Sequence, residues 1–99
     1  MNLLTETENT LAHRGKTRAD VTFICNNGER ITTEAFKQAA NREYDNGYGY
    51  GGVEVSRSLY IVGQNWWLER ATYDGSEWWE FKKKPTLPKK VADSARLFE

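Results

Sequence analysis

Two glutamates of this chain come nearest to a catalytic pattern. If Asp74-Gly75 forms a two-residue turn between two aromatic strands, Glu69 and Glu80 face each other across the ribbon. A pair of carboxylates can hydrolyse a glycosidic bond when a substrate cleft separates them. Directly opposed positions on an open ribbon provide no such cleft. We therefore interpret both residues as solvated surface acids.

Other residue types that perform catalysis are isolated along the chain. His13 is the only histidine, and it falls at the end of a predicted helix with no Ser or Cys beside it. Cys25 is the only cysteine, and we expect it to be a small buried hydrophobe. One His and one Cys cannot build a structural zinc site. We expect no enzymatic activity, no cofactor and no metal.

Residues 47–52, GYGYGG, match the pattern G-x-G-x-x-G. The dinucleotide-binding motif needs a strand before it and a helix after it, whereas here a predicted helix precedes and a predicted strand follows. We reject a nucleotide site on that ground. The glycines indicate a flexible connection, and Tyr48 and Tyr50 favour a binding loop.

The balanced charge, 14 basic against 14 acidic side chains, conceals an uneven distribution. Residues 1–81 carry eight basic and twelve acidic side chains, whereas residues 82–90 carry five lysines and no acid. With tryptophans nearby, such lysines could bind single-stranded nucleic acid through phosphate contacts and base stacking. The acidic body opposes this function, which we keep as the alternative. The lysines concerned are Lys82, Lys83, Lys84, Lys89 and Lys90.

Apolar spacing predicts two helices. The first covers residues 3–14 and ends at Gly15, which suits the left-handed conformation after a helix. The second covers residues 33–44 after a Thr cap. Its apolar stripe consists of Phe36, Ala39, Ala40 and Tyr44.

Asn27-Gly28 and Asp74-Gly75 predict two β-hairpins, because both dipeptides accept the positive φ angles of a type I′ turn. Residues 53–55 and 58–63 lie between the hairpins and are predicted as strands. The expected fold is a small single α+β domain over residues 1–84, with an antiparallel sheet, two helices and a Trp-rich C-terminal β-hairpin. Residues 85–99 form a basic Pro/Lys tail in which 91–98 could form a short helical turn.

Neighbouring tryptophans in a strand point to opposite faces. In the two-residue register, one side of the second hairpin carries the better core set: Trp66, Leu68, Arg70, Trp79 and Phe81. A three-residue turn would instead place Arg70 opposite Glu80. The other side either lies under the first hairpin or the tail, or forms an exposed aromatic platform rimmed by acids. The candidate binding residues are Trp67, Trp78, Tyr73, Tyr48 and Tyr50, with Glu69 and Glu80 at the rim.

Three segments of the chain resemble small uncharacterised proteins of bacteriophages and prophages of Gram-positive hosts. They are TEAFKQAANREYDNGYGYGGVEV, LYIVGQNWWLER and YDGSEWWEFKKKP, and the resemblance covers residues 18–88. It implies a phage-encoded accessory protein and brings no catalytic residues. Small phage proteins of this kind often act by occupying a host protein of defence or replication machinery.

The sequence therefore predicts a non-enzymatic protein-binding module, present as a monomer or homodimer, whose partner is a host protein. No apolar run approaches the roughly 20 residues that cross a bilayer, and no secretory signal precedes the first helix. The expected location is the host cytoplasm.

Overall fold

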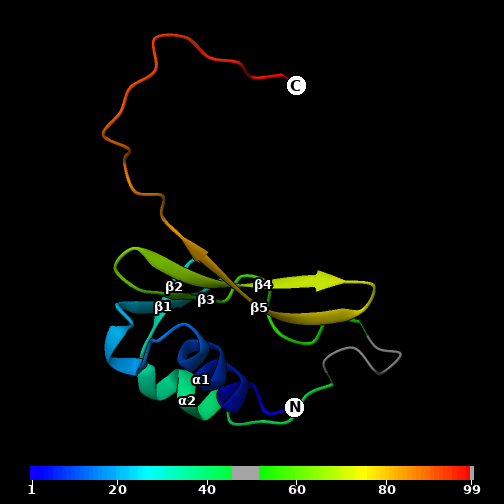
Figure 1. Ribbon diagram of the computed structural model, residues 1–99. Helices are drawn as coiled ribbons and strands as arrows, with labels where there is room; N and C mark the ends of the chain where they lie inside the picture. The colour runs from blue at the N-terminus through cyan, green and yellow to red at the C-terminus, as the bar shows by residue number, and fades with distance from the viewer. Residues whose placement is uncertain (46–51, 99) are drawn as a thin grey trace.

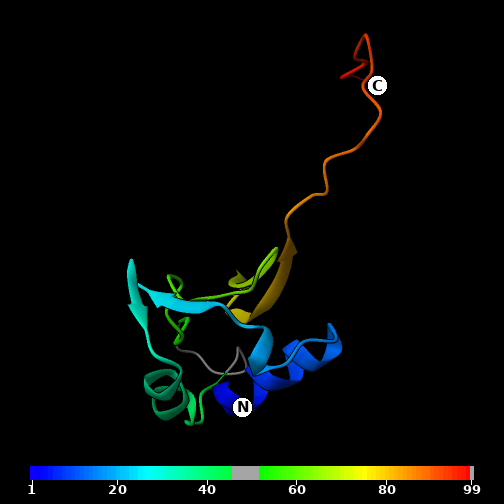
Figure 2. The ribbon, with the colours of Figure 1, turned by 90° about the vertical axis from the view of Figure 1, so that its left-hand side faces the viewer.

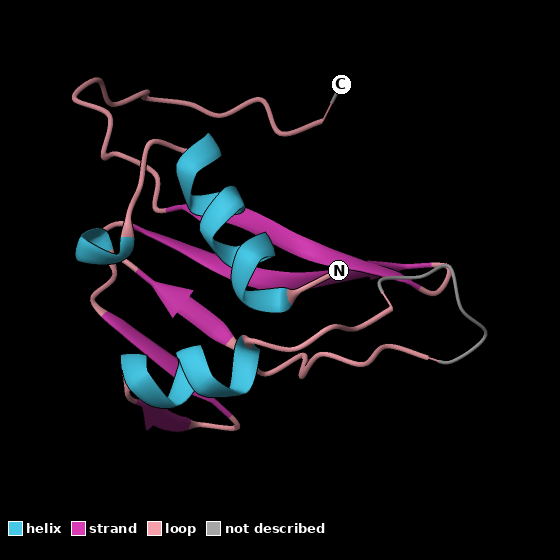
Figure 3. Ribbon diagram, turned by 90° about the horizontal axis from the view of Figure 1, so that it is seen from below, coloured by secondary structure: helices cyan, strands magenta, loops and turns pink. Residues whose placement is uncertain are grey.

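The computed structural model describes residues 1–45 and 52–98, and it places two helices on one face of a five-stranded antiparallel sheet. The sheet order is β2-β1-β3-β4-β5. Figures 1 and 2 show both helices below the sheet, and Figure 3 shows them lying across that face. The elements are α1 (Leu3–His13), a 3₁₀ turn (Arg18–Asp20), β1 (Phe23–Asn26), β2 (Glu29–Ile31), α2 (Thr33–Ala40), β3 (Tyr60–Val62), β4 (Trp66–Tyr73) and β5 (Ser76–Lys83).

Side-chain caps fix where both helices begin. The Asn2 side chain accepts a hydrogen bond from the Thr5 amide at 3.0 Å, and the Thr32 hydroxyl accepts one from the Ala35 amide at 3.0 Å. After α1 the chain turns at Gly15, whose φ of +68° matches the expected left-handed residue.

The second helix ends at Ala40, four residues before the predicted end, so the expectation that Tyr44 belongs to its stripe is wrong. The cause is that backbone groups of residues 42–44 form hydrogen bonds with the start of α1 in place of bonds within α2. The Leu3 amide donates to the Arg42 carbonyl and the Tyr44 amide donates to the Met1 carbonyl, at 3.2 and 2.8 Å. Residues 42–44 therefore run beside the start of α1, and Tyr44 is free to reach the sheet.

Both predicted hairpins form. Asn27 and Gly28, and likewise Asp74 and Gly75, have positive φ angles, as a type I′ turn requires. Ile24 pairs with Ile31 in the first hairpin. In the second, the two-residue register is confirmed and the three-residue alternative is wrong, because Glu69 pairs with Glu80 and Arg70 with Trp79.

The strand predicted over residues 53–55 is absent. The Glu54 and Val55 amides instead donate to the Glu77 carboxylate, at 2.7 and 3.1 Å, and so do not join a strand ladder. The strand predicted over 58–63 is confirmed as the shorter β3, which lies between β1 and β4.

The core lies between the helices and the lower face of the sheet. A row of paired residues, Ile24, Ile61 and Leu68, runs along its middle. Trp66 stacks on Phe81 with ring centroids 5.7 Å apart. The other core members are Leu11, Phe36, Ala40, Leu59 and Trp79.

The chain beyond β5 leaves the domain, as Figures 1 and 2 show. Residues 84–98 contain no helix or strand, so the helical turn considered for 91–98 does not form. A short helix in water needs packing against a body, and these side chains are all exposed. The Lys84 amide, which donates to the Asn65 carbonyl at 2.7 Å, ties the start of the segment to the sheet.

Candidate functional site

Both helices of the described residues lie on the lower face of the sheet, and none of that part of the chain forms a helix on the upper face. The first hairpin pairs within the sheet, and the tail leaves it, so neither covers this face. Side chains alternate along each strand, and the registers therefore assign this face's members. We call this surface the open face; its residues are Phe23, Cys25, Arg30, Tyr60, Val62, Trp67, Glu69, Ala71, Tyr73, Ser76, Trp78, Glu80 and Lys82.

The two tryptophan pairs divide between the faces. Trp66 and Trp79 are 3% and 6% exposed, whereas Trp78 is 40% exposed and Trp67 is half-buried. The expectation that neighbouring tryptophans point to opposite faces is therefore confirmed. Trp78 pairs with Ala71, a side chain too small to cover an indole. The large ring consequently offers apolar area to a partner.

Glu69 and Glu80 form a directly opposed acidic pair at the middle of this face. Glu69 accepts a hydrogen bond from the Trp67 indole at 2.7 Å, and Glu80 pairs with Lys82 at 3.3 Å. Like charges on opposed strand positions repel. A cation supplied by a partner would reduce that repulsion.

Two open-face aromatics were not predicted. Phe23 and Tyr60 are 37% and 36% exposed, and Tyr60 pairs with Glu69 across β3 and β4. Alternation along 20–25 and 58–63 could have indicated them, but only once the order of the strands was known. Cys25, expected to be buried, is half-exposed because it points to the open face beside Tyr60.

The remaining predicted binding residues lie at the margins or outside the described residues. Tyr73 lies at the hairpin tip and is 77% exposed. Tyr48 and Tyr50 fall within 46–51, outside the described residues. Lys82 lies on the open face opposite Trp67. Lys83 ends β5 at the edge of the sheet, and the exposed tail lysines are Lys84, Lys89 and Lys90.

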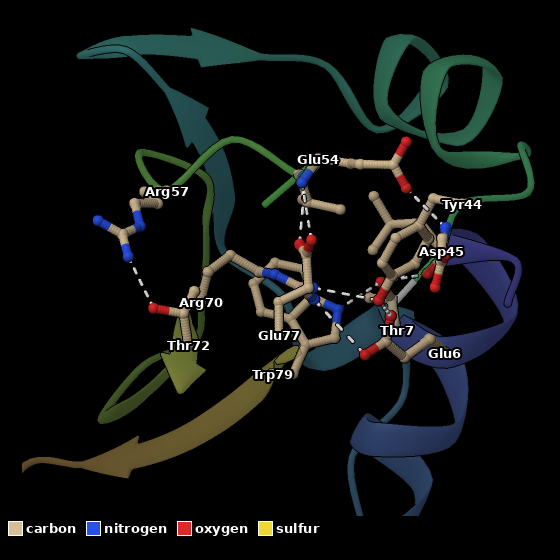
Figure 4. Close-up of polar contacts among 12 residues, drawn as sticks. Glu6, Thr7, Tyr44, Asp45, Glu54, Arg57, Arg70, Thr72, Glu77 and Trp79 are labelled. Atoms are coloured by element: carbon tan, nitrogen blue, oxygen red, sulfur yellow. Dashed lines mark hydrogen bonds and ion pairs between the residues drawn. The ribbon is translucent and has the colours of Figure 1, made fainter. Parts of the chain in front are cut away.

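A buried polar cluster on the lower face escaped the sequence analysis (Figure 4). Arg70 donates to Glu77 at 3.0 Å and to the Tyr44 hydroxyl at 3.1 Å, and it pairs with Glu6 at 3.5 Å. The Tyr44 hydroxyl also donates to Glu6. Burial, aided by this bond to Glu6, raises the pKa of Tyr44 to about 12, although Arg70 opposes the rise.

This cluster joins α1, the segment after α2 and the second hairpin. The Arg70 guanidinium lies over the Trp79 ring at 4.8 Å, and the Trp79 indole donates to Thr7 at 2.8 Å. The signal that could have found it is Glu77, an acid at a core-facing position two residues from Trp79. A buried acid needs a cation, and Arg70 is the diagonal neighbour.

A hollow of about 420 Å³ lies on the helix side, between α2 and residues 54–59. Its apolar wall includes Ile31, Phe36 and Leu59. Several polar side chains on its wall already have partners: Asn26 accepts from Ser56 at 2.6 Å, Glu54 accepts from the Asp45 amide at 2.6 Å, and Tyr44 bonds to Glu6.

Comparisons with protein-family models, with curated proteins and with solved structures find no match to this chain. The likeness to phage proteins thus stays an expectation from the sequence. Within residues 1–45 and 52–98, no three His, Cys, Asp or Glu side chains are grouped to hold a metal ion. No helix in the same ranges is long and apolar enough to cross a membrane.

Proposed function

We propose that this chain is a phage-type accessory protein that binds a host protein through its open face and performs no catalysis. The observation that carries the proposal is the placement of Phe23, Tyr60, Trp67 and Trp78 on a sheet face that no helix covers. The core is complete on the other face, so folding does not account for these rings. Aromatic side chains are enriched at the centres of protein interfaces.

The charges on this face indicate the chemistry of the partner. The acidic pair Glu69 and Glu80 lies among the rings, and residues 1–81 carry a net charge of −4, from eight basic and twelve acidic side chains. A host surface with apolar side chains around a Lys or Arg fits such a face. A host factor of defence or replication is the proposed class of target.

Capture from a lysate of a Gram-positive bacterium tests the proposal when it is combined with matched variants. A specific partner should bind the wild-type chain, bind Trp78→Phe nearly as well, and be lost with Trp78→Ala. Gln38→Ala, on the exposed side of α2, serves as the control and should retain the partner. If Trp78→Ala stays folded and captures the same protein as strongly as the wild type, the open face is not the binding surface.

Single-stranded nucleic acid is the second candidate, because Lys82 lies directly opposite Trp67. A base could stack on the indole while the lysine contacts its phosphate. Glu69 and Glu80 oppose this function, since they place two negative charges beside that position. Titration of the tryptophan fluorescence with a single-stranded oligonucleotide at low salt decides it. Salt-sensitive quenching would support nucleic-acid binding, and a flat titration would eliminate it.

A further inference from the structure

The tail carries apolar and basic side chains that are exposed along residues 85–98. Leu87, Val91, Leu97 and Phe98 are at least 80% exposed, although they are large and apolar. Lys84, Lys89 and Lys90 accompany them with no acid between residues 82 and 90. The segment is thus a basic strip with apolar side chains.

The open face has the opposite charge at its centre and exposed apolar area, and it therefore matches this strip. It offers exposed rings for apolar side chains, and its centre holds Glu69 and Glu80 with one local lysine, Lys82. Opposite charge and matched apolar area favour contact between the two.

A tail cannot easily lie on the open face of its own chain. Pro85 and Pro88 hold their own backbone extended and restrict the residues before them to extended conformations. At about 3.1 Å per residue, Lys89 lies about 15 Å beyond Lys84 and points away from the domain, as Figure 2 shows for the course of the chain. To reach its own Glu80, the tail would have to reverse after that stiff stretch.

We propose that the tail of one copy, residues 85–98, lies on the open face of a second copy. Lys89 and Lys90 then lie beside Glu69 and Glu80 of the other copy, and the apolar tail residues pack against its exposed aromatic rings, Trp78 among them. The exchange is reciprocal, so the two tails form one two-fold symmetric dimer. The inference rests on the proposed function, because it uses the same open face. The tail of the second copy then competes with the host protein for that face.

Sedimentation equilibrium of the full chain and of residues 1–84 gives the first test. The shorter form retains every helix and strand of the described residues, the whole core and the Lys84 amide bond, and residues 85–98, which it lacks, are all exposed, so we expect it to fold on its own. In the micromolar range at low salt, the full chain should have twice the chain mass of 11.4 kDa and residues 1–84 should be monomeric.

Two results would overturn the proposal. One is a full chain that stays monomeric throughout the range; if its tryptophan emission also differs from that of residues 1–84, the tail lies on its own face instead. The other is dimerisation of residues 1–84, which would place the contact elsewhere.

Charge reversal tests the pairing itself. Glu69→Lys with Glu80→Lys, and separately Lys89→Glu with Lys90→Glu, should each give monomers whose circular dichroism matches the wild type. Mixing the two variants restores both opposite-charge contacts, so a heterodimer should form. Failure of two folded variants to associate on mixing would contradict the proposed contact. If the lysine variant of the face does not fold, Glu69→Gln with Glu80→Gln should weaken dimerisation at least tenfold, and an unchanged dimer would overturn the proposal.

Capture of the host protein distinguishes the two proposals. If both hold, residues 1–84 should capture more host protein than the full chain, because no tail competes. If the chain is monomeric yet Trp78→Ala abolishes capture, the tail inference fails and the proposed function stands. If the dimer forms and Trp78→Ala captures the same host proteins as the wild type, the proposed function fails and the tail inference stands.

Discussion

Arg70 of β4 donates to Glu77 of β5 at 3.0 Å, and neither side chain exposes any surface to solvent. The same carboxylate accepts the Glu54 and Val55 amides, so one buried acid holds both the guanidinium and the returning chain. The hairpin is thereby joined to the segment that follows residues 46–51. Removing Arg70 would leave the buried Glu77 carboxylate without its cation, and removing Glu77 would leave Arg70 with Glu6 alone, at 3.5 Å.

Glu77→Ala should therefore destabilise the fold severely. We expect a loss of about 3–5 kcal/mol in the free energy of unfolding, because the variant removes the nearer carboxylate of buried Arg70 and the acceptor of the Glu54 and Val55 amides. Urea denaturation followed by tryptophan fluorescence measures it. Glu80→Ala, three residues along the same strand but exposed, is the control and should change stability by less than about 0.5 kcal/mol. Equal effects of the two variants would contradict the role assigned to the buried pair.

Tyr44 should make stability depend on alkaline pH. Its pKa is about 12 in the folded chain against an ordinary 10.0, so unfolding releases its proton between those values and stability falls as the pH rises through that window. Below pH 10 the contribution is fully present. Tyr44→Phe lacks the hydroxyl and should cost about 1 kcal/mol near neutral pH.

Comparison of the wild type with Tyr44→Phe separates the contribution of Tyr44 to the pH dependence of stability from that of the other groups that titrate at alkaline pH. The stability difference between wild type and Tyr44→Phe, measured by urea denaturation at several pH values, should stay constant up to about pH 10 and shrink toward pH 12. A difference that grows over this range would contradict the direction of the shift.

The two tryptophans of β5 should respond oppositely to truncation. Trp79→Ala removes a buried ring that donates to Thr7, and we expect a cost of about 3–5 kcal/mol. Trp78→Ala removes an exposed ring, and the cost should stay below about 1 kcal/mol. Thermal unfolding of both variants is the measurement. A Trp78→Ala chain as unstable as Trp79→Ala would place Trp78 among the residues that hold the fold.

Gly63 is required by the position of Trp66. A Cβ at residue 63 would overlap the Trp66 indole, which is buried and stacked on Phe81 and so cannot withdraw. Gly63→Ala should cost about 1–3 kcal/mol or more. Gly52→Ala, where a Cβ meets open space, is the matched control. Denaturation midpoints compare the two, and a Gly63→Ala chain as stable as the control would contradict the close approach.

The sequence was sufficient to predict what short-range geometry determines. Asn27-Gly28 and Asp74-Gly75 set their own turns, and each turn sets the register of its hairpin by counting outward. Alternation then assigned Trp66 and Trp79 to the core, and Trp67 and Trp78 to the opposite face. These conclusions depend on contacts between residues close in the chain.

Contacts between distant segments were not predictable in the same way. The early end of α2 follows from hydrogen bonds between residues 42–44 and the start of α1, more than 35 positions away. The missing strand at 53–55 follows from the Glu77 carboxylate, and Tyr60 joins the open face only because β3 pairs with β4. Neither helix propensity nor alternation contains such information.

The alternation of indoles along β4 and β5 has a consequence for how this protein can change. Trp66 and Trp79 face inward while Trp67 and Trp78 face outward, so substitutions on the outer side leave the interior undisturbed. Recognition can then drift in evolution, or be redesigned by mutagenesis, while the scaffold keeps its shape. A chain with the proposed binding function would gain from that independence.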